Sequence, residues 1–477
     1  MTMTILFDHS SDDGTRSCHS TKELHVAPMV NYSNREFRAL LRILSGRLVL
    51  WTEMLADNTL LHTSAAKRDD LLLLQQDSDN NNNRNVIVQI GSNSPERAAQ
   101  CVILLHEHYY LYIKEINLNC ECPSSTVAEK NQFGAALMKS PTRMADIVAA
   151  MQSAALAHHL EGLDVSIKMR IGVDDQDDWE FVANLIGLLV ERGGCTRFIL
   201  HARKVYLQGL NARQNRTKPP LNYQRVFRLC QQFPNCQFWL NGGIATLEQA
   251  KELAYGYTNT CSHHDTTGQE DALTAPLPVA PSNLRGVMMG RAALDNVALF
   301  GDVDRYFYGA PSNPCHNRAD VLEQYCLYLE RTYPRRCCDD NSCKTLRYPA
   351  PVVHFTAPCC PVCQVLHGTT ILTSLMQDDH DDDDENTAPT TTQQSHHDRA
   401  AGTNNKDKIS SRLIGNALKP VQSLFAGLPC HKAFRRVSSV LVVQDATIRN
   451  CGPGFVLRMA VRQSVPREYL LQPLVVP

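Results

Sequence analysis

A cysteine followed by a proline lies directly after one of the apolar runs of this chain. The run Tyr112–Asn119 breaks off into Cys120-Glu121-Cys122-Pro123-Ser124. Polar and reactive residues at the end of a strand are where a parallel-sheet enzyme carries its chemistry. The chain has 18 cysteines, however, and most free cysteines are small buried hydrophobic residues. Cys122 is therefore a candidate catalyst only if the residues around it support that role.

Two further apolar runs end in glycines and a guanidinium group. Asn241-Gly242-Gly243 follows one of them and Gly290-Arg291 follows the other. Glycines allow a ligand to approach the backbone amides closely, and arginine binds phosphate well. Parallel barrels commonly hold a phosphate after their last two strands. These two motifs together predict a phosphate site.

Other strand ends carry residues that suit an electron-rich ring. Lys168 ends one run, and a cation near N1 and O2 of a flavin stabilises the anionic reduced form. His201 ends the next run, although a lone histidine is more often structural. Gln89 would supply a neutral amide to the same ring. Ala27-Pro28-Met29 ends the first run and completes the set of strand-end residues.

Eight short apolar runs, each followed by a helical stretch, must position these side chains. Strands that alternate with helices predict parallel pairing, and eight of them fit a (β/α)₈ TIM barrel of the α/β class better than an open sheet. The carboxyl ends of barrel strands share one face, so we expect the strand-end residues to gather there. The predicted strands are Leu24–Met29, Leu48–Met54, Val86–Ile90, Tyr112–Asn119, Val165–Arg170, Arg197–His201, Gln237–Asn241 and Arg285–Gly290.

A smaller helical domain is predicted after the barrel. Helical patterns cover Arg318–Thr332 and Ile409–Val440, and a low-complexity segment with the acidic run Asp378–Glu385 separates them. We therefore divide the chain into an N-terminal tail (1–22), a barrel (23–311), a C-terminal helical domain (312–441) interrupted by a disordered insertion (336–408), and a C-terminal tail (442–477). The last segment shows no pattern that predicts structure.

Composition is that of an ordinary globular protein, with 43% hydrophobic and 20% charged residues. No apolar run approaches the ~20 residues of a spanning helix, so no membrane association is expected. Met1–Thr21 lacks the pattern of a signal or transit peptide, which favours a soluble intracellular protein, in the cytoplasm or an organelle. The scattered cysteines predict reduced thiols. Residues 336–406 hold ten acidic and five basic residues, so the rest of the chain carries a formal charge of +3, compatible with a polyanionic partner.

Taken in order, the strand-end motifs resemble those of the tRNA-dihydrouridine synthases. They are Ala-Pro-Met, Thr-Glu-Met, Gln-Ile-Gly, Asn-Leu-Asn-x-x-Cys-Pro-Ser, Lys-x-Arg-Ile-Gly, His-Ala-Arg, Asn-Gly-Gly and Gly-Arg. The resemblance covers residues 24–310 and, more weakly, the helical pieces 318–335 and 409–441. It implies an FMN-dependent barrel that reduces a uracil ring of tRNA at the expense of NADPH. It also implies that hydride reaches C6 of the uracil from the flavin while Cys122 gives a proton to C5. The implied FMN-binding residues are Ala27, Pro28, Met29, Gln89, Lys168, His201, Asn241, Gly242, Gly243, Gly290 and Arg291.

The loops after the fifth and sixth predicted strands are similar to those of the A-type branch of this family. They are Ile171–Asp177 and the segment from His201 to Leu221. That branch acts on uridines 20 and 20a of the tRNA D-loop, so the resemblance implies those targets. The positions that match its tRNA contacts are Asn119, Arg213, Arg216, Lys432 and Arg435. Basic residues three apart lie on one face of a turn or helix, and two such faces can bracket a phosphate backbone. The expected partners are tRNA and NADPH, and a monomer is expected.

Glu121 departs from the family pattern, which has a glycine at this position. A carboxylate beside the thiol would favour protonated Cys122, but its bulk and charge would disturb the turn or repel RNA phosphate. The run Phe133–Leu137 lacks a second cysteine that the family often has, which again favours Cys122 as the proton donor.

Three alternatives remain open. One is an FMN barrel reductase of a small molecule, against which the basic residues of the helical domain argue, since a small substrate needs no such platform. Another is a decayed, non-catalytic RNA-binding homologue, in which Glu121 in place of the family's glycine would indicate the loss of activity. The third is zinc bound by Cys338, Cys343, Cys360 and Cys363. The low-complexity surroundings and the absence of a second clean C-x₂-C pair argue against zinc, and no metal site is predicted.

Overall fold

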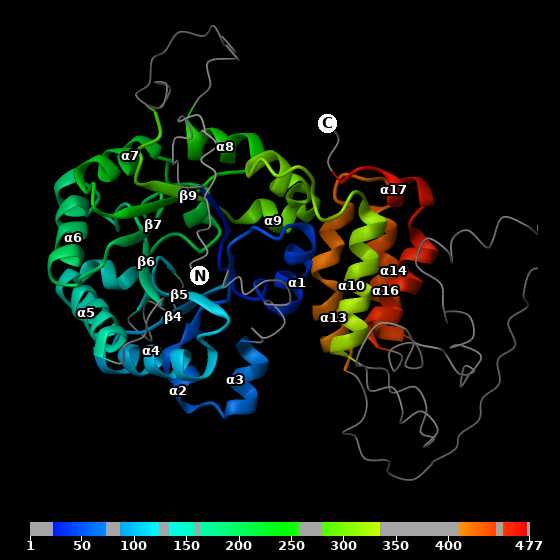
Figure 1. Cartoon of the computed structure of the whole chain (residues 1–477), viewed down its shortest axis with the longest axis horizontal. Helices are drawn as coiled ribbons and strands as arrows, with labels where there is room; N and C mark the ends of the chain where they lie inside the picture. Colours follow the sequence, from blue (N-terminus) through cyan, green and yellow to red (C-terminus); the bar gives the residue numbers. More distant parts are fainter. Residues whose placement is uncertain are drawn as a thin grey trace, which may run out of the picture.

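A computed structural model describes residues 22–72, 86–123, 133–157, 163–256, 279–333, 410–444 and 452–474. Parallel strands lie at the centre of one body with helices around them, and a second body made only of helices lies beside it (Figure 1). The predicted insertion (336–408), which contains the four cysteines of the zinc alternative, lies outside the described residues. Within the described residues, no helix combines the length and apolar character needed to cross a membrane.

The strands form a parallel barrel. Their order is β1-β9-β8-β7-β6-β5-β4-β2, and β3 also pairs with β4. The amide of Val26 donates to the carbonyl of Val49 and the amide of Val49 donates to that of Leu24, both at 3.0 Å, which joins β1 to the segment before β2. The predicted TIM barrel is confirmed, with the second predicted strand divided into β2 and β3. The strands are β1 (Glu23–Val26), β2 (Leu50–Trp51), β3 (Leu55–Ala56), β4 (Val86–Gly91), β5 (Ile113–Cys120), β6 (Asp164–Arg170), β7 (Arg197–His201), β8 (Gln237–Asn241) and β9 (Leu284–Met289).

The barrel strands are apolar because both of their faces are covered. Every residue of β4 is buried, as are all but the first of β6. Trp51, Ile199 and Trp239 belong to a small apolar cluster separate from the main core, whose residues lie on the strands and the surrounding helices. Parallel sheets covered on both faces have this kind of sequence.

Helices surround the barrel, and several begin at side-chain caps. The Asn34, Ser94, Asp178 and Thr246 side chains accept hydrogen bonds from backbone amides three residues on. Such caps satisfy amides that have no partner within the helix. The helices are α1 (Arg35–Leu44), α2 (Asp57–His62), α3 (Ala65–Leu72), α4 (Pro95–Tyr109), α5 (Pro141–Ala157), α6 (Trp179–Glu191), α7 (Tyr223–Gln232), α8 (Leu247–Tyr255) and α9 (Arg291–Asp295), with the shorter turns η3 (Gly134–Lys139), η4 (Gln214–Arg216), η5 (Val297–Asp302) and η6 (Val303–Phe307).

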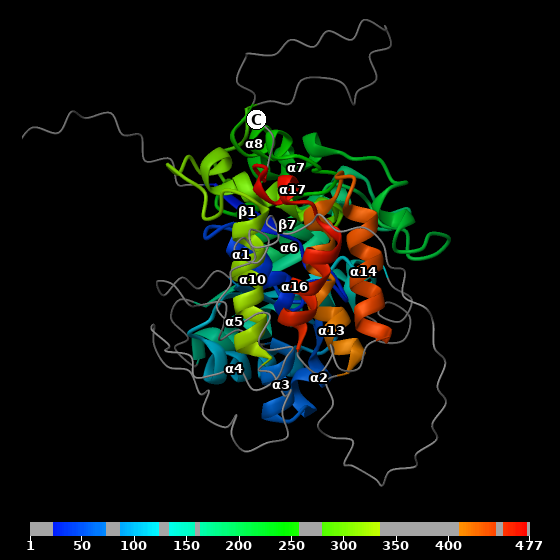
Figure 2. The ribbon, with the colours of Figure 1, turned by 90° about the vertical axis from the view of Figure 1, so that its right-hand side faces the viewer.

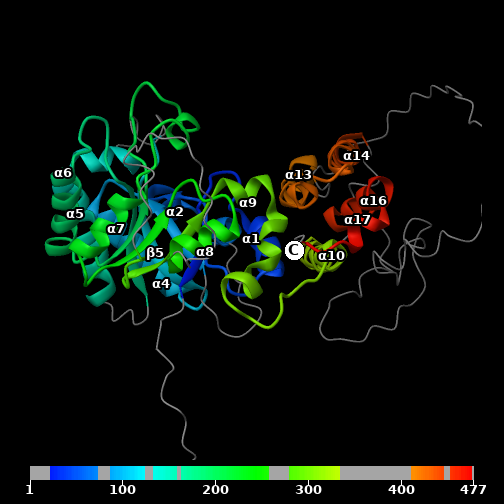
Figure 3. The same ribbon diagram turned by 90° about the horizontal axis from the view of Figure 1, so that it is seen from above.

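The second body is a bundle of helices, as the sequence predicts, but it extends further along the chain. The helices α10, α13, α14 and α16 run beside one another (Figure 2), and the bundle lies next to α1 and α9 of the barrel (Figure 3). The segment 442–477, predicted to be a C-terminal tail in which no pattern indicated an element, contains α16 and α17. Arg458 of α16 binds Glu323 and Glu330 of α10, each at 3.0 Å. The elements are α10 (Arg318–Thr332), α13 (Ser411–Leu418), η8 (Pro420–Phe425), α14 (His431–Gln444), α16 (Pro453–Ser464) and α17 (Arg467–Leu471).

A polar network lies at the N-terminal end of the barrel strands. The carboxylate of Glu23 accepts from the ring nitrogens of His25 at 3.0 Å and Trp239 at 2.9 Å, and it pairs with Lys114. The Trp51 ring nitrogen donates to Nδ1 of His25 at 3.3 Å. His25 is fully buried, so these contacts satisfy polar groups at the end of the barrel opposite the predicted site.

Candidate active site

Cys122 lies just beyond the carboxyl end of β5 and is half-buried. The side-chain oxygen of Asn119 accepts hydrogen bonds from the amides of Glu121 at 3.2 Å and Cys122 at 3.0 Å. The neighbouring Cys120 is completely buried in the barrel wall, and burial raises the pKa of its thiol well above the usual value. Of the two cysteines, only Cys122 is placed where a substrate could reach it.

Asn119 and Gln89 support each other at the base of this turn. The amide nitrogen of Asn119 donates to the side-chain oxygen of Gln89 at 2.8 Å. Both side chains are buried, on the neighbouring strands β5 and β4. This hydrogen bond fixes the orientation of the Asn119 side chain. It thereby also fixes the amides of Glu121 and Cys122, which donate to the Asn119 oxygen.

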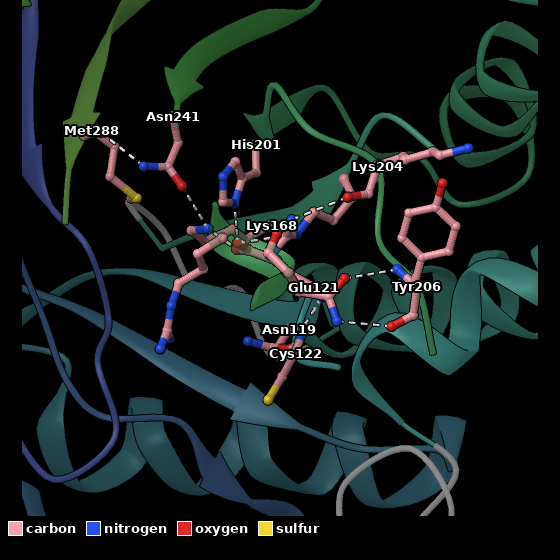
Figure 4. Close-up of polar contacts among 12 residues, drawn as sticks. Asn119, Glu121, Cys122, Lys168, His201, Lys204, Tyr206, Asn241 and Met288 are labelled. Carbon is pink, nitrogen blue, oxygen red and sulfur yellow. Dashed lines mark hydrogen bonds and ion pairs between the residues drawn. The ribbon is translucent and has the colours of Figure 1, made fainter. Parts of the chain in front are cut away.

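Lys168, His201 and Asn241 meet on three consecutive strands (Figure 4). The ammonium of Lys168 donates to the side-chain oxygen of Asn241 at 3.1 Å, and the Asn241 amide donates to the carbonyl of Met288 at 2.8 Å. All three side chains are buried at the carboxyl ends of their strands. The structure thus brings Lys168 and His201, which the sequence predicts to contact a ring, together with Asn241, which it predicts for the phosphate site.

The Glu121 side chain points into this group. Its carboxylate pairs with Lys168 and lies 2.5 Å from Nδ1 of His201 (Figure 4). It also lies 3.5 Å from Nε of Arg170. The Glu121 side chain is only 15% exposed. From the sequence, this carboxylate was expected to affect Cys122 and RNA phosphate, and its contacts within the barrel were not predicted.

The residues around Glu121 make a cationic site. Burial, the Arg170 guanidinium and Lys168 hold the pKa of His201 well below its usual value. Burial, together with Arg170, likewise lowers the pKa of Lys168, whereas the carboxylate in contact favours its charged form. Burial, with Arg216 and Arg203 nearby, lowers the pKa of Arg170 to about 9. Crowded cations of this kind favour an anion among them.

Two of the predicted phosphate-site glycines are required by the local geometry. Gly242 has φ +117° and Gly243 has φ +73°, conformations that strain other residues. A Cβ atom would lie 2.7 Å from Cδ2 of His201 at Gly242, and 2.5 Å from a methyl group of Leu221 at Gly243. At Gly290, φ is −120° and a Cβ would meet that of Ala27 at an ordinary 3.6 Å, so packing does not require glycine there.

The remaining predicted cofactor residues lie at the same end of the barrel. Ala27-Pro28-Met29 follows β1, where Ala27 donates to the carbonyl of Met289 at 2.8 Å. Arg291 opens α9, and its guanidinium donates to the carbonyl of Arg216 at 3.2 Å. The buried Nε of Arg203 has no hydrogen-bond partner among the described residues.

The residues predicted to grip RNA lie on two bodies. Arg213 and Arg216 are exposed in the loop after β7, which the buried Asn215 side chain holds through hydrogen bonds to both backbone groups of Tyr206. Lys432 and Arg435 are exposed on α14 of the helical bundle. Asn119, by contrast, is buried beneath Cys122.

Arg170 ends a predicted strand together with Lys168, but no role was predicted for it. Its guanidinium donates to the carbonyls of Asn215 at 2.9 Å and Lys204 at 3.3 Å, joining β6 to the basic loop. Side chains two apart on a strand share a face, so the Lys-x-Arg motif held this signal. No cluster of metal-binding side chains is found among the described residues.

Comparison with known proteins agrees with this geometry. The family model described as Dihydrouridine synthase (Dus) matches residues 25–260. A Vibrio cholerae protein named tRNA-dihydrouridine(20/20a) synthase is 34% identical over 317 residues, which are 66% of this chain and 81% of the relative. A protein of the same name from Escherichia coli K12 is 34% identical over 313 residues, which are 66% of this chain and 77% of the relative. Another from Synechocystis is 35% identical over 311 residues, which are 65% of this chain and 79% of the relative. The chain therefore belongs to the dihydrouridine synthase family of oxidoreductases, as its strand-end motifs predicted.

Proposed function

We propose that this protein reduces the C5–C6 double bond of uridines 20 and 20a in the tRNA D-loop, with FMN as cofactor and NADPH as reductant. The half-buried thiol of Cys122, presented at the end of β5 beside the Lys168, His201 and Asn241 group, is the observation that carries the proposal. The relatives that share most of this chain carry the name of that activity.

The residues present suit FMN. Because Gly242 and Gly243 carry no side chain, their backbone stays uncovered and a ligand can approach it. The buried Nε of Arg203 has no hydrogen-bond partner among the described residues, so it can donate to a ligand. Together with Arg291 and Gly290 they would hold the phosphate. Lys168, His201, Gln89 and the Ala27-Pro28-Met29 turn would hold the ring, and Lys168 would stabilise its reduced, anionic form.

Cys122 would act as an acid. When bound, reduced flavin would supply the hydride that C6 of the uracil receives, and NADPH would reduce the oxidised flavin again. The Cys122 thiol transfers its proton to C5, so that the double bond gains one hydride and one proton and the sulfur becomes a thiolate. Electrostatic interaction with Arg170 and Arg216 stabilises that thiolate until solvent reprotonates it. A thiol suits this role because its ordinary pKa of about 8.5 leaves it protonated at neutral pH.

The target uracil has to leave the RNA stack before it can reach Cys122. Asn119 has one amide hydrogen left after its bond to Gln89, and this hydrogen could bind the uracil. Arg213 and Arg216, exposed in the loop after β7, would contact the D-loop backbone, and Lys432 and Arg435 on α14 would hold further phosphates.

The decisive experiment maps dihydrouridine in tRNA from cells that lack this protein. Positions 20 and 20a should lose the modification, and the wild-type gene should restore it while Cys122→Ala should not. An unchanged map after deletion would refute the substrate, and full rescue by Cys122→Ala would refute the role of the thiol. Filter binding of tRNA at two salt concentrations separates this function from reduction of a small molecule, because binding should weaken steeply with salt.

A further inference from the structure

We propose that Glu121 is an internal counter-ion of the flavin pocket, bound by Lys168 and His201 in the cofactor-free enzyme and displaced when FMN enters. The inference rests on the proposed function, since it assumes that FMN uses this pocket. It makes Glu121 a residue that sets the affinity of the enzyme for its cofactor.

The geometry supports an inward, bound carboxylate. Glu121 pairs with Lys168 and lies within 2.5 Å of the His201 ring and 3.5 Å of the Arg170 guanidinium. Two of these partners, Lys168 and His201, are the side chains that suit the flavin ring. An N–H group that donates to the Glu121 carboxylate is not available to the flavin ring, so Glu121 and FMN compete for these donors.

Burial makes the competition costly for either ligand. The Lys168 and Arg170 side chains are only 3% and 1% exposed. A buried charge without a partner is strongly unfavourable, so the Glu121 carboxylate stabilises the charged Lys168 and Arg170 side chains. FMN carries a negative phosphate, and a second anion in the same pocket repels it. When the flavin ring takes Lys168 and His201 as its donors, the carboxylate has to leave them, and the ion pairs that are lost subtract from the binding free energy.

Displacement needs only the side chain to move. The amide of Glu121 is held by the side-chain oxygen of Asn119 at 3.2 Å, as is the next amide, so the backbone of the turn is anchored. Rotation about the side-chain bonds of Glu121 can withdraw the carboxylate while Cys122 keeps its position. The Glu121 side chain can thus make way for FMN without moving Cys122, the proposed proton donor.

The test measures FMN affinity and stability in Glu121→Gln and Glu121→Gly. Gln keeps the shape and removes the charge, whereas Gly also removes the side chain. The control is Asp175→Asn, which removes the same charge from an exposed position in the loop after β6. FMN dissociation constants come from quenching of flavin fluorescence, and melting temperatures are measured with and without FMN.

We expect both Glu121 variants to bind FMN about tenfold more tightly or better, and Asp175→Asn to bind like wild type. Without FMN the Glu121 variants should melt at lower temperature, and FMN should raise their melting temperature by more than it raises that of wild type. Unchanged or weaker FMN binding, with lower melting temperatures in both states, would mean a purely structural role and overturn the inference. Failure of wild type and both variants to bind FMN would instead overturn the proposed function.

Discussion

The amide of Cys122 donates a hydrogen bond of 3.0 Å to the side-chain oxygen of Asn119, so the residue that ends the apolar part of β5 also positions the thiol. Asn119→Ala removes this acceptor and leaves the amides of the turn without it. Because a displacement of about 1 Å can cost about 100-fold in rate, we expect kcat for dihydrouridine formation to fall by that order. The measurement is single-turnover dihydrouridine formation with enzyme preloaded with FMN.

Asn119→Asp is the matched control for this position. It keeps an oxygen for the two backbone amides but loses the donor to Gln89. We expect it to retain more activity than Asn119→Ala. Equal loss in both variants would show that the amide donor, rather than the bond to Cys122, is what matters.

Cys122 and Cys120 allow the proposed acid to be tested against a neighbour. Cys122→Ala should lower the rate of dihydrouridine formation by about 10²- to 10⁴-fold, the usual contribution of a general acid. Cys120→Ala should keep its rate and lose about 1 kcal/mol of unfolding free energy, because Cys120 is buried in the core. Product is measured in purified tRNA and stability by urea unfolding. If only Cys120→Ala lost rate, Cys120 would be the proton donor and Cys122 would not.

The sequence predicted the barrel well because each strand end carries a recognisable residue and all eight ends share one face. Lys168, His201 and Asn241 could be grouped from strand order alone. The direction of Glu121 could not be predicted, because it depends on Lys168 and Arg170 of β6 and on His201 of β7, which only the folded barrel brings to the turn. The helix α16 was missed for a similar reason: its pairing of Arg458 with Glu323 and Glu330 joins segments on opposite sides of the insertion.

Glu23 should make the protein sensitive to acid. Burial raises the pKa of its carboxyl, but the hydrogen bond and charge of His25, with Lys114, outweigh burial and hold it well below the usual value. A depressed carboxyl pKa adds stability above the unfolded pKa of about 4.3, and this stability is lost as pH falls through the folded pKa. Burial also lowers the pKa of His25, so the unfolded state takes up its proton first, below about pH 6.5. Both groups act in the same direction.

Glu23→Gln tests this assignment. We expect the variant to be less stable than wild type at pH 7 and to lose less unfolding free energy between pH 5 and pH 3. Urea unfolding across this range gives the comparison. If wild type and variant lose stability in parallel, the acid sensitivity comes from other groups.

Lys419 joins the helical bundle to the barrel. Its ammonium lies 3.6 Å from the centre of the Tyr32 ring and donates to the carbonyl of Asn31 at 2.9 Å. Lys419→Met keeps the aliphatic stem and removes the charge, and exposed cation–π contacts contribute about 0.5–1 kcal/mol. We expect KM for tRNA to rise a few-fold with little change in FMN affinity, because the bundle that carries the RNA contacts becomes less firmly held.

Lys251 provides a close control for Lys419. Its ammonium lies 4.6 Å from the Tyr306 ring centre and donates to the Tyr306 carbonyl at 2.9 Å, but both residues belong to the barrel. Lys251→Met should leave KM for tRNA unchanged. A similar rise in both variants would mean that general loss of positive charge, rather than the contact between the two bodies, weakens RNA binding.

Lys432 and Arg435 should contribute to tRNA affinity through phosphate contacts. Both are exposed and lie three residues apart on α14, so one phosphate backbone can meet both. Each contact that is lost should reduce the slope of log affinity against log salt by about 0.7 to 0.9. The double variant Lys432→Ala/Arg435→Ala should therefore bind tRNA more weakly and with a smaller salt slope, as filter binding at several salt concentrations would show. Arg467→Ala, at an exposed position on α17 of the same bundle, is the control for charge alone. If Arg467→Ala changes the slope by half as much as the double variant on α14, the bundle attracts tRNA by its total charge and α14 is not a specific contact.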